Sequence, residues 1–158
     1  MKARPADAVF FAIEAVELAL AGIDRTRSSD VIRRREAEAI LSRLADVPVA
    51  ILIANDRARY VEVNTAATTL TGYTRSELLR ISVWNLTPEA NRTQGMIAWE
   101  GFLRDGRQSG TYQLRCKDGT LVRTTYVAIA HVLPGLHLSA LATSELVRSL
   151  GRRKPHST

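Results

Sequence analysis

Cysteine and long apolar runs are both scarce in this sequence of 158 residues. Its one cysteine, Cys116, excludes an internal disulfide and any zinc site that is built from several cysteines. The longest apolar stretch, Val47 to Ala54, is far shorter than the roughly 18 residues that a membrane-spanning helix needs. Asp7 and Glu14 interrupt the amino-terminal segment, which therefore lacks the apolar core of a signal peptide. We expect a cytoplasmic protein that does not enter a membrane.

Motifs of the common enzyme classes are missing as well. The sequence has no Gly-rich phosphate loop followed by lysine, no Gly-x-Ser-x-Gly turn and no metalloprotease helix motif. We could pair no acid with a base for proton transfer. His131 and His137 flank a turn at Pro134-Gly135, but no carboxylate lies near them in the sequence, which disfavours a metal site there. We expect a protein that is not an enzyme and binds no metal.

Basic residues exceed acidic ones by 22 to 16, and the excess is concentrated at the end of the chain. Residues 144–158 carry four basic and one acidic side chain, whereas the rest of the chain is nearly balanced. One alternative is a DNA-associated transcriptional regulator that uses Arg33-Arg34-Arg35 and the tail Arg152-Arg153-Lys154. No recognition motif accompanies these runs, so we do not expect nucleic acid to be the partner. We interpret 144–158 as a basic, disordered tail.

Residues 1–45 are predicted to form a helical extension. From Asp7 to about Arg27, apolar side chains recur at alternating spacings of four and three, which indicates one face of a helix. A second helical pattern runs from Val31 to Ala45. The pattern leaves open whether the two form a hairpin or one rod, and whether the first packs on its own domain or on a second copy. The candidate residues for a homodimer interface are Val9, Ile13, Val16, Leu20 and Ile23.

Residues 46–143 change to the period of two that is typical of strands, interrupted by helical segments. Asn64 and Gly72 are predicted to begin and end a short helix, because asparagine is a good N-cap and glycine accepts a positive φ. Asp118-Gly119 is predicted to form a tight hairpin turn. A longer helix is expected at Glu89 to Leu103. The expected strands are 50–53, 60–63, 112–116, 121–131 and 136–141.

Three motifs occur in order within this region. They are Asn64 to Leu78 with the sequence NTAATTLTGYTRSEL, Val83 to Pro88 with VWNLTP, and Lys117 to Thr120 with KDGT. Together they resemble the PAS domain family over roughly Leu44 to Thr143. The resemblance implies an α+β fold, in which a five-stranded antiparallel sheet carries short helices on one face. We therefore divide the chain into a helical extension, 1–45, a PAS domain, 46–143, and a tail, 144–158.

The resemblance also implies a ligand cavity between the sheet and its helices. Such a cavity would be apolar here, with an unknown occupant. The candidate wall residues are Ile53, Leu79, Trp84, Met96, Trp99, Leu114, Tyr126 and Ala128.

Two cofactors of PAS relatives are disfavoured by the residues present. Flavin photosensors that resemble this family place a reactive cysteine in the short helix after the glycine-tyrosine motif, and Leu79 to Trp84 contains none. Heme sensors place a histidine on a helix that crosses the sheet, and residues 75–104 contain none. A redox sensor that holds flavin without a covalent bond is a remaining alternative.

Our functional expectation is a stand-alone sensory module of bacterial type. The family's aspartate-isoleucine-threonine ending is replaced by Leu141-Ala142-Thr143, which disfavours transmission to a following effector domain. We expect the module to bind a small apolar ligand or a signalling protein, and to act through homodimerisation or protein-protein interaction.

Overall fold

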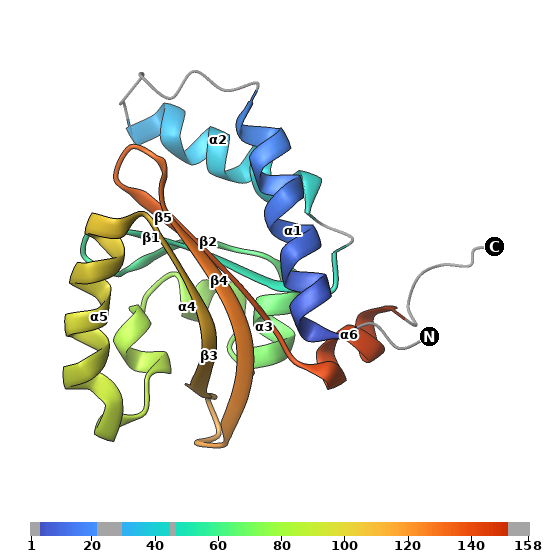
Figure 1. Ribbon diagram of the computed structural model, residues 1–158, viewed down its shortest axis with the longest axis vertical. Coiled ribbons are helices and arrows are strands. Elements are labelled where there is room, and N and C mark those ends of the chain that lie inside the picture. Colours follow the sequence, from blue (N-terminus) through green and yellow to red (C-terminus); the bar gives the residue numbers. More distant parts are fainter. Residues whose placement is uncertain (1–3, 22–29, 45–46, 152–158) are drawn as a thin grey trace.

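A computed structural model describes residues 4–21, 30–44 and 47–151, with the side chains given for 4–21, 35–44 and 47–148. Its centre is a five-stranded antiparallel sheet with the strand order β2-β1-β5-β4-β3. Helices cover both faces of this sheet (Figure 1). The strands are β1 (Ala50–Asn55), β2 (Tyr60–Val63), β3 (Arg107–Arg115), β4 (Leu121–Leu133) and β5 (Leu136–Ala142). The predicted α+β fold with a five-stranded antiparallel sheet is confirmed.

The strands form where the period of two predicted them, with one notable extension. Strand β3 begins at Arg107, five residues before the expected start at Tyr112. Its first half is mostly exposed and contains Gly110, so it lacks the apolar alternation that marks a half-buried strand. Pairing with Thr125–Ile129 of β4 nevertheless holds it in the sheet.

One face of the sheet carries the helices α3 (Thr65–Thr71), α4 (Arg75–Leu78) and α5 (Arg92–Asp105), with 3-10 turns η1 (Val83–Leu86) and η2 (Glu89–Asn91) between α4 and α5. The predicted capping roles are confirmed. The Asn64 side chain accepts a hydrogen bond from the backbone N–H of Ala67, and Gly72 ends α3 with φ 82°. Gly119 has φ 88° in the turn between β3 and β4, as the hairpin requires.

The opposite face is covered by α1 (Pro5–Leu20) and α2 (Asp30–Arg43), which are two separate helices in contact with each other and not one rod (Figure 1). Four of the candidate dimer residues face inward and pack with Ile51, Leu138 and Ala140 of the sheet. These four are Val9, Ile13, Val16 and Leu20.

The interface assignment of these four residues is therefore corrected. Their stripe is buried in the chain's own core, because the sheet presents an apolar face of its own that needs a cover. Ile23, the fifth candidate, lies outside the described residues. The outward side of α1 instead exposes Phe10, Phe11 and Leu18.

The prediction of a disordered tail was wrong for its first half. Ser144–Gly151 forms a helix, α6, whose Leu146 and Val147 are buried. Thr143 Oγ1 accepts a hydrogen bond from the backbone N–H of Leu146 and so caps the first turn. The basic charge of this segment indicated a solvated tail, but its apolar residues form one side of a helix that packs on the domain. Residues 152–158 lie outside the described range. Within the described ranges, no helix is long and apolar enough to cross a lipid bilayer.

Candidate functional site

A cavity of about 380 Å³ lies between the sheet and the helical segments η1 and α5. All five strands contribute residues to its floor, and Gly95, Ala98, Trp99 and Phe102 contribute from α5. The predicted wall residues that do line it are Trp84, Trp99, Leu114, Tyr126 and Ala128. The two tryptophans meet edge to face, with ring centroids 6.1 Å apart.

The other three predicted wall residues lie elsewhere. Ile53 is buried on the opposite face of the sheet, among the residues under α1, whereas its neighbours Leu52 and Ala54 line the cavity. Successive residues of a strand point to opposite faces, so the prediction placed Ile53 on the wrong face of the sheet. Met96 is 48% exposed on α5, one position away from the cavity-facing Gly95. Leu79 caps the C-terminus of α4 and is half-buried outside the lining.

Sequence reasoning missed most of the polar groups of this cavity. Tyr112 lies two residues before Leu114 on β3, so the alternation that selected Leu114 also indicated Tyr112. Tyr60 on β2 and His137 on β5 line the cavity as well. Their strands are buried on both faces, where alternation between polar and apolar residues carries no signal.

Three phenols reach this cavity. The Tyr112 and Thr87 hydroxyls share a hydrogen bond, and the Tyr126 hydroxyl donates to Gln108 Oε1 at 3.0 Å. Tyr60 is 7% exposed, and its hydroxyl has no hydrogen-bond partner among the described residues. Burial raises the pKa of Tyr60 well above its ordinary value and also raises the pKa of Tyr112. Burial raises the pKa of Tyr126 too, so all three phenols are neutral hydrogen-bonding groups near pH 7.

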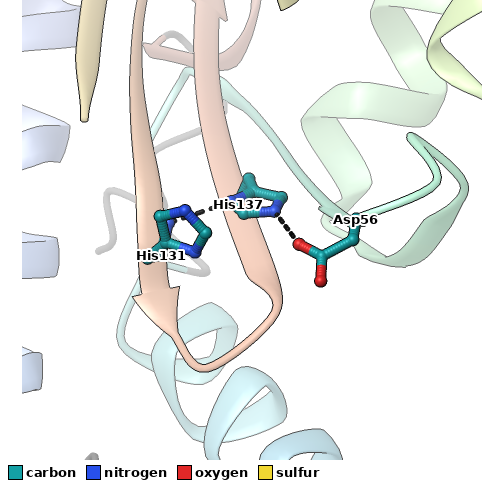
Figure 2. A group of neighbouring side chains, drawn as sticks. All are labelled: Asp56, His131 and His137. Atoms are coloured by element: carbon teal, nitrogen blue, oxygen red, sulfur yellow. Dashed lines mark hydrogen bonds and ion pairs between the residues drawn. The ribbon is translucent and has the colours of Figure 1, made fainter. Parts of the chain in front are cut away.

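His137 forms another part of the wall, next to the rings of Trp99 and Phe102. Its Nδ1 accepts a hydrogen bond from the backbone N–H of His131 at 2.9 Å, and its Nε2 lies 2.7 Å from Asp56 Oδ1 (Figure 2). Since Nδ1 accepts, Nε2 carries the proton and donates to the carboxylate. Burial is the main cause of a lowered pKa of His137. The imidazole is neutral near pH 7, and neither nitrogen is directed at the cavity.

The lining as a whole carries no lysine, arginine, aspartate or glutamate among the described residues. Cys116 does not line the cavity. Its thiol donates a hydrogen bond to the backbone carbonyl of Leu70 at 3.3 Å. Burial raises the pKa of this thiol, as expected for a small buried side chain that is not a nucleophile. Such a cavity suits an uncharged ligand with a largely apolar body.

Comparison with known proteins identifies the family to which this fold belongs. A family model described as the PAS domain matches residues 48–133, more than half of the chain. The chain belongs to the PAS domain family. Domains of this family are generally sensory and signalling modules. No curated protein matches it significantly.

Solved structures of PAS domains from different organisms are similar to this chain. A PAS domain from Colwellia psychrerythraea has a TM-score of 0.58 and 17% identity, over 72% of this chain and 97% of that one. A domain of a sensory box sensor histidine kinase/response regulator from Geobacter sulfurreducens has a TM-score of 0.56 and 21% identity, over 67% and 92%. A PAS domain of a LuxR-family transcriptional regulator from Burkholderia thailandensis, in complex with ethanol, has a TM-score of 0.54 and 12% identity, over 64% and 93%.

Proposed function

We propose that this PAS domain senses a small, uncharged, mostly apolar molecule in the cavity between the sheet and α5. The observation that carries the proposal is the phenol of Tyr60, which lines a cavity of about 380 Å³ and whose hydroxyl has no hydrogen-bond partner among the described residues. A ligand with a hydrogen-bonding oxygen or nitrogen gains about 0.5–1.5 kcal/mol from one bond to this hydroxyl. The volume lies at the lower end of the range for small-molecule sites.

The chemistry of the walls supports an uncharged occupant. No permanently charged side chain lines the cavity among the described residues, and burial keeps Tyr60, Tyr112 and His137 neutral. A charged ligand would lose its hydration without gaining a counter-charge there. The structurally similar domain from Burkholderia thailandensis is described in complex with ethanol, a small neutral molecule.

The two tryptophans give a direct test, because the chain has only two and both line the cavity. We expect neutral aromatic ketones or alcohols to change the tryptophan fluorescence saturably, and carboxylates of the same size to have no effect. Ala128→Leu, which fills the cavity, should abolish the change. Tyr60→Phe should weaken binding by about fivefold to tenfold, in line with one lost hydrogen bond. Tyr73→Phe, outside the lining, is the matched control.

Either of two results would overturn this proposal. The first is saturable binding of carboxylates in preference to neutral analogues. The second is binding that is unaffected by Ala128→Leu in a variant that remains folded. Absorbance from 250 to 700 nm on the freshly purified protein, with mass spectrometry of released small molecules, would also detect a flavin or a heme if either accompanied the chain.

A second part of the proposal concerns output by association with another copy. Phe10, Phe11 and Leu18 are 60%, 67% and 73% exposed on the outward side of α1, and large apolar side chains gathered on one surface mark interaction sites. We propose that this side, and not the inward stripe, contributes to a cytoplasmic homodimer. Light scattering at high concentration should show a dimer that Phe11→Asp weakens and Glu14→Gln does not. A monomeric wild-type chain would contradict it.

A further inference from the structure

Three side chains from distant parts of the sequence meet at one place (Figure 2), and one of them, His137, also lines the cavity. Asp56 lies in the turn between β1 and β2, His131 near the end of β4, and His137 near the start of β5. Each offers one ligand atom, and these three atoms lie within 4.8 Å of one another. The His137 side chain is 1% exposed, whereas Asp56 is 66% exposed and His131 is on the surface. The cluster is therefore anchored on one side and open to solvent on the other.

We propose that Asp56, His131 and His137 bind a divalent transition-metal ion of the Zn²⁺ type. Two imidazoles and one carboxylate form a donor set that suits Zn²⁺ and its neighbours in the first transition row, and two nitrogen donors disfavour Ca²⁺ and Mg²⁺. Three protein ligands leave one position for water or for a small ligand that arrives from solvent. The inference does not rest on the proposed function of the cavity.

An irregularity in β4 brings His131 into this cluster. The pairing of β4 with β5 shifts between Ile129 and Leu133, and His131 has φ 55°, a left-handed conformation that is uncommon outside glycine. In a regular strand Ala130 and Val132 would share a face. Here Ala130 packs with Phe102 on the cavity side, whereas Val132 lies in the core under α1. A bulge of this kind redirects a side chain, and the His131 ring consequently lies 4.6 Å from that of His137, centroid to centroid.

The hydrogen bonds of the metal-free cluster predict what a metal would change. The proton on His137 Nε2 now joins this nitrogen to Asp56 Oδ1, 2.7 Å away, and a metal bound to both atoms takes the place of that proton. The neutral imidazole then carries its proton on Nδ1. The backbone N–H of His131, which now donates to Nδ1, has to turn away. This peptide lies within the bulge, so it can turn without breaking a regular ladder bond.

Titration of the full-length chain with Zn²⁺, and with Co²⁺ for its visible absorption, tests the site after dialysis against a chelator. We expect one ion per chain. Asp56→Asn keeps an acceptor for His137 Nε2–H but removes the carboxylate, and His131→Gly keeps the positive φ but removes the imidazole. Both variants should fold and should bind Zn²⁺ at least tenfold more weakly. Asp118→Asn, an exposed aspartate of another turn, should bind like the wild type.

Binding by His156, the remaining histidine, has to be distinguished from binding at the cluster. His156→Ala should leave the affinity unchanged, and loss of binding in this variant would overturn the proposal. Wild-type affinity in both Asp56→Asn and His131→Gly would overturn it as well. Amide exchange gives an independent readout, because Zn²⁺ should accelerate exchange of the His131 N–H. An amide that stays protected when the chain is saturated with Zn²⁺ would contradict ligation through His137 Nε2.

Discussion

The two faces of the sheet are filled in different ways. On the α1 side, apolar side chains from α1, α2 and three strands form one continuous cluster that contains Ile13, Ile51 and Leu138. On the α5 side, a smaller cluster under α3 and α4 adjoins a cavity whose walls combine aromatic rings with hydroxyl and amide groups. The amino-terminal helices thus complete a filled core, whereas α5 and η1 leave a cavity over the other face of the sheet.

The largest effect is expected from truncation of a side chain on the α1 side of the sheet, which is called the closed face below. Ile13→Ala removes a side chain that is 1% exposed between α1 and the sheet, and such truncations cost about 2–5 kcal/mol. Urea denaturation measures the loss in the free energy of unfolding. Glu14→Ala, on the exposed side of the same helix, should change it by no more than about 0.5 kcal/mol. Equal effects for the two variants would mean that α1 does not belong to the core of this domain.

Enlarging an alanine on each face compares the two fillings directly. Ala140 of β5 is fully buried under α1, and Ala140→Leu should cost about 1–3 kcal/mol because that cluster has no room. Ala128 of β4 lines the cavity, so Ala128→Leu should leave the free energy of unfolding nearly unchanged. Thermal and urea denaturation of both variants measure the difference. A larger loss for Ala128→Leu would show that the cavity is closed in solution.

A smaller effect is expected from the unpartnered phenol. Tyr60→Phe removes a hydroxyl that has no hydrogen-bond partner among the described residues. The free energy of unfolding of the ligand-free protein should therefore change by no more than about 0.5 kcal/mol, because no protein hydrogen bond is lost at this cavity-lining position. Tyr126→Phe is the matched control, because it removes the donor of the hydrogen bond to Gln108 and should destabilise instead. A loss of stability in Tyr60→Phe would indicate a partner for its hydroxyl in solution.

The closed face and the α5 side of the sheet, called the open face, also differ in how well the sequence predicted them. Capping and turn residues such as Asn64 and Gly119 act locally, so their types and spacing were sufficient to predict the order of the elements. The apolar stripe on the inward side of α1 could also be recognised in the sequence. Such a stripe shows only that the helix packs against some apolar surface. It does not tell whether the partner is the chain's own sheet or a second copy.

The open face was harder to predict, because its polar groups depend on phase and on contacts between distant segments. Ile53 was assigned to the cavity on the strength of its apolar character, although Leu52 and Ala54 occupy that side. The hydrogen bond between Asp56 and His137 joins residues 81 positions apart, so no motif could reveal it. These two side chains come together because β1, which precedes Asp56, pairs with β5 in the sheet.

The smallest effect, on a reaction rate, is expected at Cys116, in the open face's cluster but outside the cavity. Burial raises the pKa of its thiol, so at any given pH less of it is the reactive thiolate than in an unfolded chain. Reaction with a disulfide reagent at pH 8 should therefore be slower in the folded protein and become fast in urea. A midpoint of the rate against pH should lie above the ordinary cysteine value. Because Cys116 lies outside the lining, ligands that change the tryptophan fluorescence should leave this rate unaltered. Protection of Cys116 by such a ligand would mean that the cavity extends to the end of β3.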